Sequence, residues 1–386
     1  MKKTLSIILF AALSLSLTAC SQILGNKTSK PIPLKPLKAV VTQLKTTVNW
    51  QVNTGSAMGE NKIHPYLDKI NVYIAGGVSV SARAKNNGKQ VWLTSIGENI
   101  SAGVNGSLNT SQQIFLGTSN GNAISLDAKT GKIKWIERLE SEVLSVSPSK
   151  DGRVAFRTSD GKLHGLSSST GELIWQQTQH PPKLTLMGAS VPVLVGPYVI
   201  SGFDNGKVAA YHLQTGEAAW EVTLTLPRGR TELERIIDVD GKLKPIGSAL
   251  FAASMNGSIN GIILKDGSTV WSKRFSSSTG VNADPQGLYS SDSKGKIWKV
   301  DPQTGAPIWS MDDLLRYEPT LPILVGASLI VVADKKGNIH WINTNTGKII
   351  ARIKGDPSGY SIEPEVSGNS IYAMGKSGVL TKISIR

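Results

Sequence analysis

The chain has 386 residues, a formal net charge of +14 and one cysteine, Cys20. A single cysteine excludes a disulfide within the chain, so stability has to come from packing. A basic chain often binds nucleic acid or an anionic membrane. Here the charge is spread along the sequence without an arginine-rich run, which favours a solvated surface and no nucleic-acid binding.

Residues 1–19 are typical of a cleaved secretory signal peptide. Two lysines precede an apolar stretch that is too short and wrongly flanked for a membrane-spanning helix. The following LTAC at positions 17–20 resembles a bacterial lipobox, which predicts that Cys20 is lipidated; the alternative is an ordinary signal peptide that ends near a cysteine. Ser21, in place of an aspartate, favours anchoring in the outer membrane at its periplasmic face.

Residues 20–38 are predicted to be the lipidated cysteine and a flexible tether. The stretch SQILGNKTSKPIPLKPLK has three prolines, four lysines and no regular apolar period, a composition typical of a solvated linker. Fully extended, these eighteen residues span at most about 60 Å. The folded body can therefore lie well clear of the membrane surface.

The rest of the chain repeats one short motif, of which LDAKTGKIKW at residues 126–135 is an example. A Thr-Gly turn separates two apolar runs, and its glycine can adopt the positive φ that a tight hairpin demands. Ala351 takes the place of a tryptophan that ends the other units. These tryptophans are Trp50, Trp92, Trp135, Trp175, Trp220, Trp271 and Trp309. Successive spacings along the eight units are 42, 43, 40, 45, 51, 38 and 42 residues.

A period near 40 residues that holds four short strands is typical of a β-propeller blade. A second marker, a glycine in a turn, occurs once per unit, at Gly77, Gly121, Gly161, Gly206, Gly257, Gly295, Gly337 and Gly378. Each end of the chain holds only part of a blade. We therefore predict an all-β, eight-bladed propeller of four-stranded antiparallel blades over residues 39–386. Pairing of the N-terminal strand with the C-terminal blade would close the ring and remove two open sheet edges.

The recurring tryptophans are predicted to form a structural ring. Each follows the loop that leads into a blade's outermost strand, so its side chain would face the neighbouring blade and cover backbone there. Burying such a ring is worth a few kcal/mol. Ala351 would mark the one seam between blades without this side chain.

The D-x-x-T-G-x-x-x-W repeat resembles that of the quinoprotein dehydrogenase-like propellers. The enzymes of that superfamily use acidic calcium ligands and a quinone stacked on a vicinal disulfide. This chain has no cysteine pair, its five histidines lack metal-ligand spacing, and DVDG at 238–241 lacks the downstream ligands of a calcium loop. We therefore predict no catalytic residue, no metal and no cofactor.

Lipobox, tether and eight-unit propeller together resemble the BamB family, the lipoprotein subunits of the outer-membrane β-barrel assembly machinery. The resemblance covers essentially the whole chain. It implies a scaffold that docks on the periplasmic POTRA domains of BamA, the barrel-forming subunit, and assists insertion of outer-membrane proteins. It also implies contact with unfolded outer-membrane proteins.

The sharpest local matches lie in the two longest intervals between motifs, RTELERIIDVD at 230–240 and PPKLTLMG at 181–188. By resemblance, these loops hold the partner-binding residues, namely Leu184, Leu186, Met187, Arg235, Asp238 and Asp240. The family has an arginine where this chain has Met187, so one charged contact is missing or replaced by packing.

Interval lengths give this assignment independent support, because propeller insertions lie in surface loops and these two are in adjacent blades. Their loops can converge on one patch of exposed leucines and an acidic pair. The opposing hypothesis is that Leu184 and Leu186 are ordinary strand residues and that DVDG is a solvated turn. For the function, a quinone-dependent periplasmic dehydrogenase and a lipoprotein scaffold of another envelope complex stay open.

Overall fold

The computed structural model describes residues 34–55, 62–108, 112–186, 188 and 190–386. Contacts within the chain separate residues 1–36 from a body of residues 37–386. The predicted signal peptide, Cys20 and most of the predicted tether lie outside the described residues. Within the described ranges, no helix is long and apolar enough to cross a membrane.

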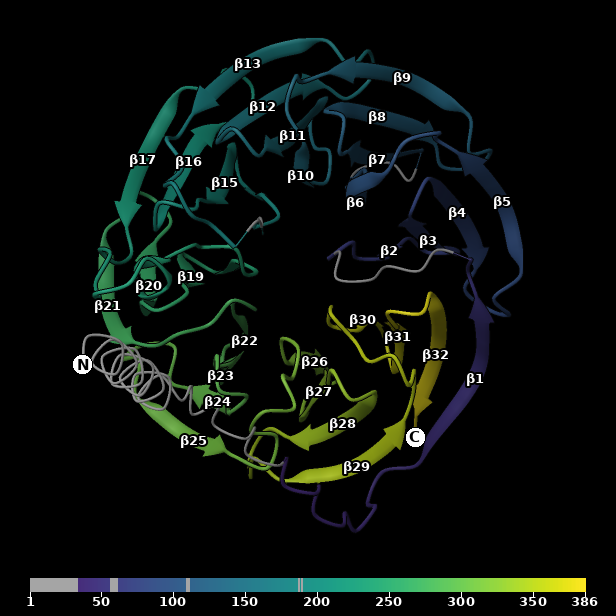
Figure 1. The fold of residues 1–386 in the computed structure, drawn as a ribbon, viewed down its shortest axis with the longest axis vertical. Coiled ribbons are helices and arrows are strands. Elements are labelled where there is room, and N and C mark those ends of the chain that lie inside the picture. Colours follow the sequence, from purple (N-terminus) through teal and green to yellow (C-terminus); the bar gives the residue numbers. More distant parts are fainter. Residues whose placement is uncertain (1–33, 56–61, 109–111, 187, 189) are drawn as a thin grey trace, which may run out of the picture. The chain divides into compact units, whose positions relative to one another are not determined.

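The body is a ring of eight four-stranded sheets, as predicted (Figure 1). One blade consists of β2 (Tyr66–Leu67), β3 (Asn71–Gly76), β4 (Ser79–Ala84) and β5 (Gln90–Ser95). The next consists of β6 (Ile100–Gly106), β7 (Gln113–Thr118), β8 (Asn122–Asp127) and β9 (Ile133–Arg138). It is followed by β10 (Val143–Val146), β11 (Arg153–Thr158), β12 (Lys162–Ser167) and β13 (Leu173–Thr178). The fourth has β14 (Val193–Val195), β15 (Tyr198–Gly202), β16 (Lys207–His212) and β17 (Ala218–Thr223).

The chain continues around the ring in the same way. The fifth blade has β18 (Lys244–Ile246), β19 (Ala249–Ala253), β20 (Ser258–Ile263) and β21 (Thr269–Arg274). The sixth has β22 (Asn282–Asp284), β23 (Gly287–Ser291), β24 (Ile297–Val300) and β25 (Pro307–Met311). The seventh has β26 (Ile323–Val325), β27 (Leu329–Ala333), β28 (Asn338–Asn343) and β29 (Ile349–Lys354). The last has β30 (Glu365–Ser367), β31 (Ser370–Met374), β32 (Val379–Ile385) and, from the other end of the chain, β1 (Thr46–Asn53).

Ring closure occurs through the two chain ends, as predicted. Strand β1 pairs antiparallel with β32, from Thr46 opposite Ile385 to Asn53 opposite Val379. In Figure 1 the purple β1 runs beside the yellow β32 on the outer rim. The sheet of this blade therefore has the order β1-β32-β31-β30, and no extra strand edge is left at the closure.

Seven seams between blades share one tryptophan contact. Each indole N–H donates to a backbone carbonyl in the Thr-Gly loop, or its counterpart, of the following blade, at 2.8–3.1 Å. The ring also lies against the glycine of that loop. A Cβ added at Gly131, for example, would be 2.5 Å from the Trp92 ring, and Gly131 has a φ of 73°. The glycine thus serves both the turn and the close approach of the ring.

The eighth seam lacks the tryptophan because the final blade has no such loop. Its third strand, β32, ends the chain, and its fourth strand, β1, comes from the N-terminal side. Ala351 of β29 is buried there, and Leu44, just before β1, packs in the same cluster. The N–H of Gln43 donates to the carbonyl of Ile350 at 2.8 Å. The entering chain therefore occupies the space that a loop and an indole fill at the other seams.

Candidate functional site

The two long connections between blades meet in space, as their positions in adjacent blades predict. Residues 179–192 join β13 to β14, and residues 224–243 join β17 to β18. The N–H of Leu186 donates to Oδ2 of Asp238 at 2.6 Å. At Gly188 an added Cβ would lie 2.5 Å from Oδ2 of Asp240, so a side chain there would collide with this carboxylate. The first loop therefore lies directly on the aspartates of the second.

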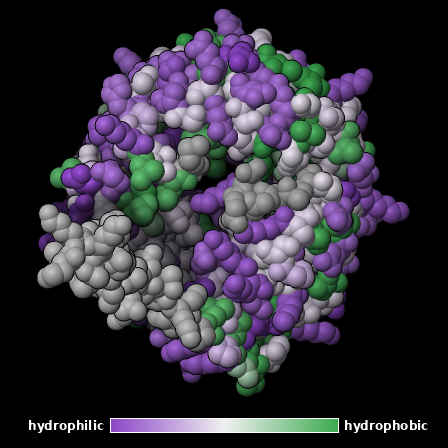
Figure 2. Space-filling view, in the orientation of Figure 1, coloured by the Kyte–Doolittle hydropathy of each residue, from purple (hydrophilic) through white to green (hydrophobic). Residues whose placement is uncertain are grey.

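The outer side of this junction exposes several leucines among charged residues. Leu184 and Leu186 are each 42% exposed, so neither is an ordinary buried strand residue. Leu226 and Leu233 of the second loop are more exposed still, Leu233 at 70%. Figure 2 shows hydrophobic residues beside the central opening of the face in view. Leu226 and Leu233 are absent from the sequence prediction, although their place in the longest interval between motifs was a usable signal.

The second loop is held in shape by its own hydrogen bonds. It contains the 3-10 helix η1 (Leu233–Arg235). The Glu234 carboxylate accepts hydrogen bonds from the N–H groups of Arg230 and Thr231, at 2.7 and 3.1 Å, and these bonds fix the segment ahead of η1. The side-chain amide of Asn256 donates to the carbonyls of Leu233 and Ile236. Leu233 is thus exposed on an ordered turn.

The predicted partner residues differ in their exposure to solvent. Arg235 is exposed and lies 3.8 Å from Glu232, across one turn of η1. Met187 lies outside the described residues. Asp238 and Asp240 are only 1% and 8% exposed, so the expectation of an exposed acidic pair is wrong. The reason is that DVDG is not a solvated turn: the first loop covers it and Leu186 hydrogen-bonds to it.

Beneath the leucines, Asp238 and Asp240 belong to a buried charged cluster. Asp204, from the turn after β15, brings its carboxylate within 4.8 Å of theirs. Arg157 of β11 forms an ion pair with Asp204 and is completely buried, with its guanidinium 5.2 Å from the Phe203 ring. The cluster joins three successive blades. Sequence analysis missed Arg157 and Asp204 because neither lies in a motif or a long interval.

This cluster is short of hydrogen-bond partners. Among the described residues, none pairs with Oδ1 of Asp238 or with either oxygen of Asp240 in normal geometry, and Nε and Nη1 of Arg157 are likewise unpaired. Burial raises the pKa of Asp238 to about 7, against the Leu186 N–H, which lowers it. Burial also raises the pKa of Asp240 to about 6, against the lowering effect of Arg157. Both carboxyls therefore gain protons far more readily than exposed aspartates do.

Three carboxylates this close together are the ligand type of a hard cation such as Ca²⁺. Arg157 argues against that occupant, since its permanent charge already pairs with Asp204 and would repel a divalent ion. The raised pKa values indicate neutralisation by protons instead.

The junction of the loops lies beside the central cavity of the ring. This cavity has a volume of about 700 Å³, and Leu186, Gly188 and Asp240 are among the residues that line it. Next along the second loop, Lys242 extends to within 4.0 Å of Glu363, which precedes β30. His64, ahead of β2, approaches Glu365 at 3.7 Å. Ionic contacts thus link segments of three blades around the cavity.

Comparison with known proteins gives one consistent family. The family model described as outer membrane protein assembly factor BamB matches residues 76–311. The assembly factor BamB of Yersinia pestis is 29% identical, over 98% of this chain and 98% of its own length. That of Burkholderia pseudomallei is 30% identical, over 95% and 94%.

Solved structures agree on the fold. The crystal structure of BamB from Moraxella catarrhalis superimposes with a TM-score of 0.81 at 24% identity, covering 88% of this chain and all of that one. A quinohemoprotein alcohol dehydrogenase from Comamonas testosteroni reaches a TM-score of 0.67 at 12% identity, covering 88% of this chain and 76% of that one. The likeness to the dehydrogenase ends at the fold, whereas the full-length relatives are assembly factors and not enzymes.

Proposed function

Because the chain belongs to the family of outer membrane protein assembly factor BamB, we propose that it docks on the periplasmic POTRA domains of the barrel-forming subunit BamA. In this role it is a non-enzymatic scaffold of the outer-membrane β-barrel assembly complex. It would position those domains while outer-membrane proteins are inserted. The docking surface consists of the loops at residues 181–188 and 230–240.

One observation carries the choice of this surface: exposed leucines on two loops that are tied together by a 2.6 Å hydrogen bond. Exposed leucines on an ordered loop are suited to act as interface anchors, because the loop loses little conformational entropy when a partner binds. Leu226 and Leu233 are further exposed leucines of the second loop. Met187 and the exposed Arg235 complete the contact set by resemblance to the family.

Asp238 and Asp240 contribute from beneath the surface. Their carboxylates are covered by the first loop, so they act on the partner through Leu186 and Gly188 rather than by direct contact. They are positioning residues in this proposal. Loss of either carboxylate would therefore change binding by moving the leucines.

Attachment to the outer membrane follows from the N-terminal sequence. Lipidation of Cys20 and the tether up to Lys38 would keep the propeller at the periplasmic face while leaving it free to meet the partner. Unfolded outer-membrane proteins are further ligands in this proposal, by strand addition at a blade edge.

The test compares two pairs of exposed aliphatic residues. Leu184→Ala with Leu186→Ala should weaken binding to the isolated periplasmic domains of the barrel-forming subunit by about 10- to 1,000-fold, the effect of losing interface anchors. The melting temperature should change by less than about 2 °C, because the leucines are exposed. The control variant is Val91→Ala with Leu93→Ala, similarly exposed on β5.

Binding that is unchanged in the loop variant contradicts the proposal, as does an equal loss in the β5 variant. A large drop in melting temperature for the loop variant would indicate that Leu184 and Leu186 are core residues of a blade.

A further inference from the structure

The contact between the two docking loops depends on carboxyl groups whose hydrogen bonding is incomplete. We propose that Asp238 and Asp240 form a proton-binding pair that holds the loop bearing Leu184 and Leu186, so that this loop is ordered while the pair keeps a proton and loosens when the proton leaves. The proton site stands on the geometry alone. Its consequence for the partner rests on the proposed function.

Geometry supplies the first step. Oδ1 of Asp238 and both oxygens of Asp240 are buried acceptors without a hydrogen bond of normal geometry among the described residues, although the Gly188 N–H acts on Asp240. The carboxylates approach within 4.8 Å. Two ionised carboxylates can only accept hydrogen bonds, so neither can satisfy the other. One proton converts an oxygen into a donor and allows an O–H···O bond between the pair. The pair then titrates as a unit.

Charge supplies the second step. The groups that act on the pair are Arg157 from β11, Asp204 from the turn after β15, and Lys62 from the segment ahead of β2. Arg157 is already paired with Asp204. The two remaining carboxylates would bring two buried negative charges, and burial of an unpaired charge is costly. A proton removes one of these charges at no cost in volume.

The hydrogen bond to Leu186 supplies the third step, because it links protonation to the docking surface. Oδ2 of Asp238 accepts the Leu186 N–H at 2.6 Å, and a protonated carboxyl keeps such an acceptor oxygen. Ionisation alone would strengthen the bond from Leu186, but burial and the charge of Asp240 outweigh that effect, so the two ionised groups repel each other and draw water in. That movement separates Asp240 from Gly188 and Asp238 from Leu186.

The direction of the pH dependence follows from the sign of the shift. Both carboxyls have folded-state pKa values above the unfolded value, at about 7 for Asp238 and about 6 for Asp240. Their stabilising effect is complete below about pH 4, the unfolded pKa, and is lost as the pH rises through 6 to 7. The loop is therefore ordered at mildly acidic pH and more mobile at mildly alkaline pH.

Hydrogen exchange of the full chain tests this between pH 5.5 and 8.5. The protection factor of the Leu186 amide should fall at least tenfold from pH 6 to pH 8, with the amide of Val199 in β15 as the internal reference. Asp238→Asn fixes the neutral state, keeps an acceptor oxygen and adds a donor toward Asp240, so its Leu186 protection should stay flat. Asp312→Asn, on an exposed residue, should reproduce the wild-type profile.

A flat wild-type profile overturns the proposal, and so does a parallel fall in Asp238→Asn. Should that variant fail to fold, Asp240→Asn gives the same neutral partner from the other side. Carboxyl ¹³C titration of the wild type decides independently, since both groups titrating below pH 5 would overturn the site.

Docking is measured separately. Leu184→Ala with Leu186→Ala should keep the wild-type carboxyl titration while losing the partner. A pH-dependent loop combined with pH-independent partner binding would contradict the docking proposal and leave the proton site intact.

Discussion

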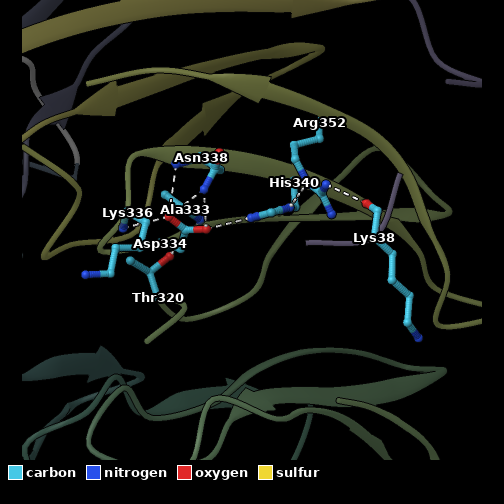
Figure 3. A network of polar contacts seen from close by, with 8 residues as sticks. All are labelled: Lys38, Thr320, Ala333, Asp334, Lys336, Asn338, His340 and Arg352. Atoms are coloured by element: carbon cyan, nitrogen blue, oxygen red, sulfur yellow. Dashed lines mark hydrogen bonds and ion pairs between the residues drawn. The ribbon is translucent and has the colours of Figure 1, made fainter. Parts of the chain in front are cut away.

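Two buried acidic clusters of the same ring differ in how completely their polar atoms are paired. Around Asp334, between β27 and β28, every carboxylate oxygen has a donor: the N–H groups of Lys336 and Asn338 at 2.8 and 3.0 Å, and Nε2 of His340 at 2.8 Å (Figure 3). Around Asp238 and Asp240, three buried oxygens have no hydrogen bond of normal geometry among the described residues. The first cluster is complete within the fold, and the second is not.

The Asp334 network also continues to the start of the body. Nδ1 of His340 accepts Nε–H of Arg352 at 3.0 Å, and Nη1 of Arg352 donates to the Lys38 carbonyl at 2.8 Å. Burial alone would raise the pKa of Asp334, but the hydrogen bonds from His340 and Asn338 outweigh it and lower the pKa. Burial lowers the pKa of His340, and only the neutral ring can accept the Arg352 hydrogen bond at Nδ1. This network has a structural role and requires no outside partner.

The two clusters differ in the role that their pairing indicates. A buried carboxylate with all its partners stabilises the blade that contains it. The carboxylates with incomplete pairing lie, in this molecule, directly under the loop that exposes Leu184 and Leu186. Incomplete pairing therefore coincides with the surface that we propose for docking.

The largest effect is expected from removing the acceptor of the complete network. Asp334→Ala leaves the buried His340 and Asn338 donors unpaired, and since each buried unpaired donor costs about 1–3 kcal/mol, a total loss of about 3–5 kcal/mol is expected. Urea unfolding measures this loss, with the exposed Asp312→Ala as control. A loss below about 1 kcal/mol would mean that water replaces the carboxylate and that the two clusters do not differ in kind.

An effect of opposite sign in the two clusters should appear in the pH dependence of stability. The lowered pKa of Asp334 places its stabilising effect above the unfolded value, so it is lost as the pH falls below about 4. The raised pKa of Asp238, about 7, means that stability is lost as the pH rises from about 4 to 7. One pKa unit corresponds to about 1.4 kcal/mol, so a rise of about three units corresponds to an effect on the order of 4 kcal/mol.

The measurement is the free energy of unfolding from pH 3 to 8.5. Asp238→Asn should flatten the loss toward alkaline pH, and Asp334→Asn should flatten the loss toward acid. If both variants remove the pH dependence of the unfolding free energy on the same side, acid or alkaline, the proposed difference between the two clusters is wrong.

Much of the fold could be predicted because the same packing contacts recur from blade to blade along the sequence. The Thr-Gly turn recurs with the tryptophan that covers it, so spacing alone gives blade number, strand order and ring closure. Small departures are local: Gly257 does not take the positive φ of its counterparts, since Asn256 does so at 47°. The sequence also marks Ala351 but not Leu44, which packs beside it, because that contact joins distant parts of the chain.

Less of the site could be predicted, for a physical reason. Interval lengths identify both loops and their convergence, since length is visible in sequence. Burial of Asp238 is not visible, because it depends on how the loop of one blade lies on that of the next. Arg157 and Asp204 enter the cluster from strands and turns of regular length. Charged residues inside ordinary blades carry no local signal of where their side chains point.

The smallest effect concerns the outer end of the complete network. Arg352→Lys keeps the positive charge, but a single ammonium cannot bridge Nδ1 of His340 and the Lys38 carbonyl as the guanidinium fork does. Loss of one such hydrogen bond should cost about 1 kcal/mol. Hydrogen exchange of residues 38–45 should rise several-fold while the amides of β28 stay protected, since Asp334 still holds His340. Arg274→Lys, on an exposed arginine of β21, is the matched control. Faster exchange in β28 as well would mean that Arg352 supports the whole network and that its two ends are not separable.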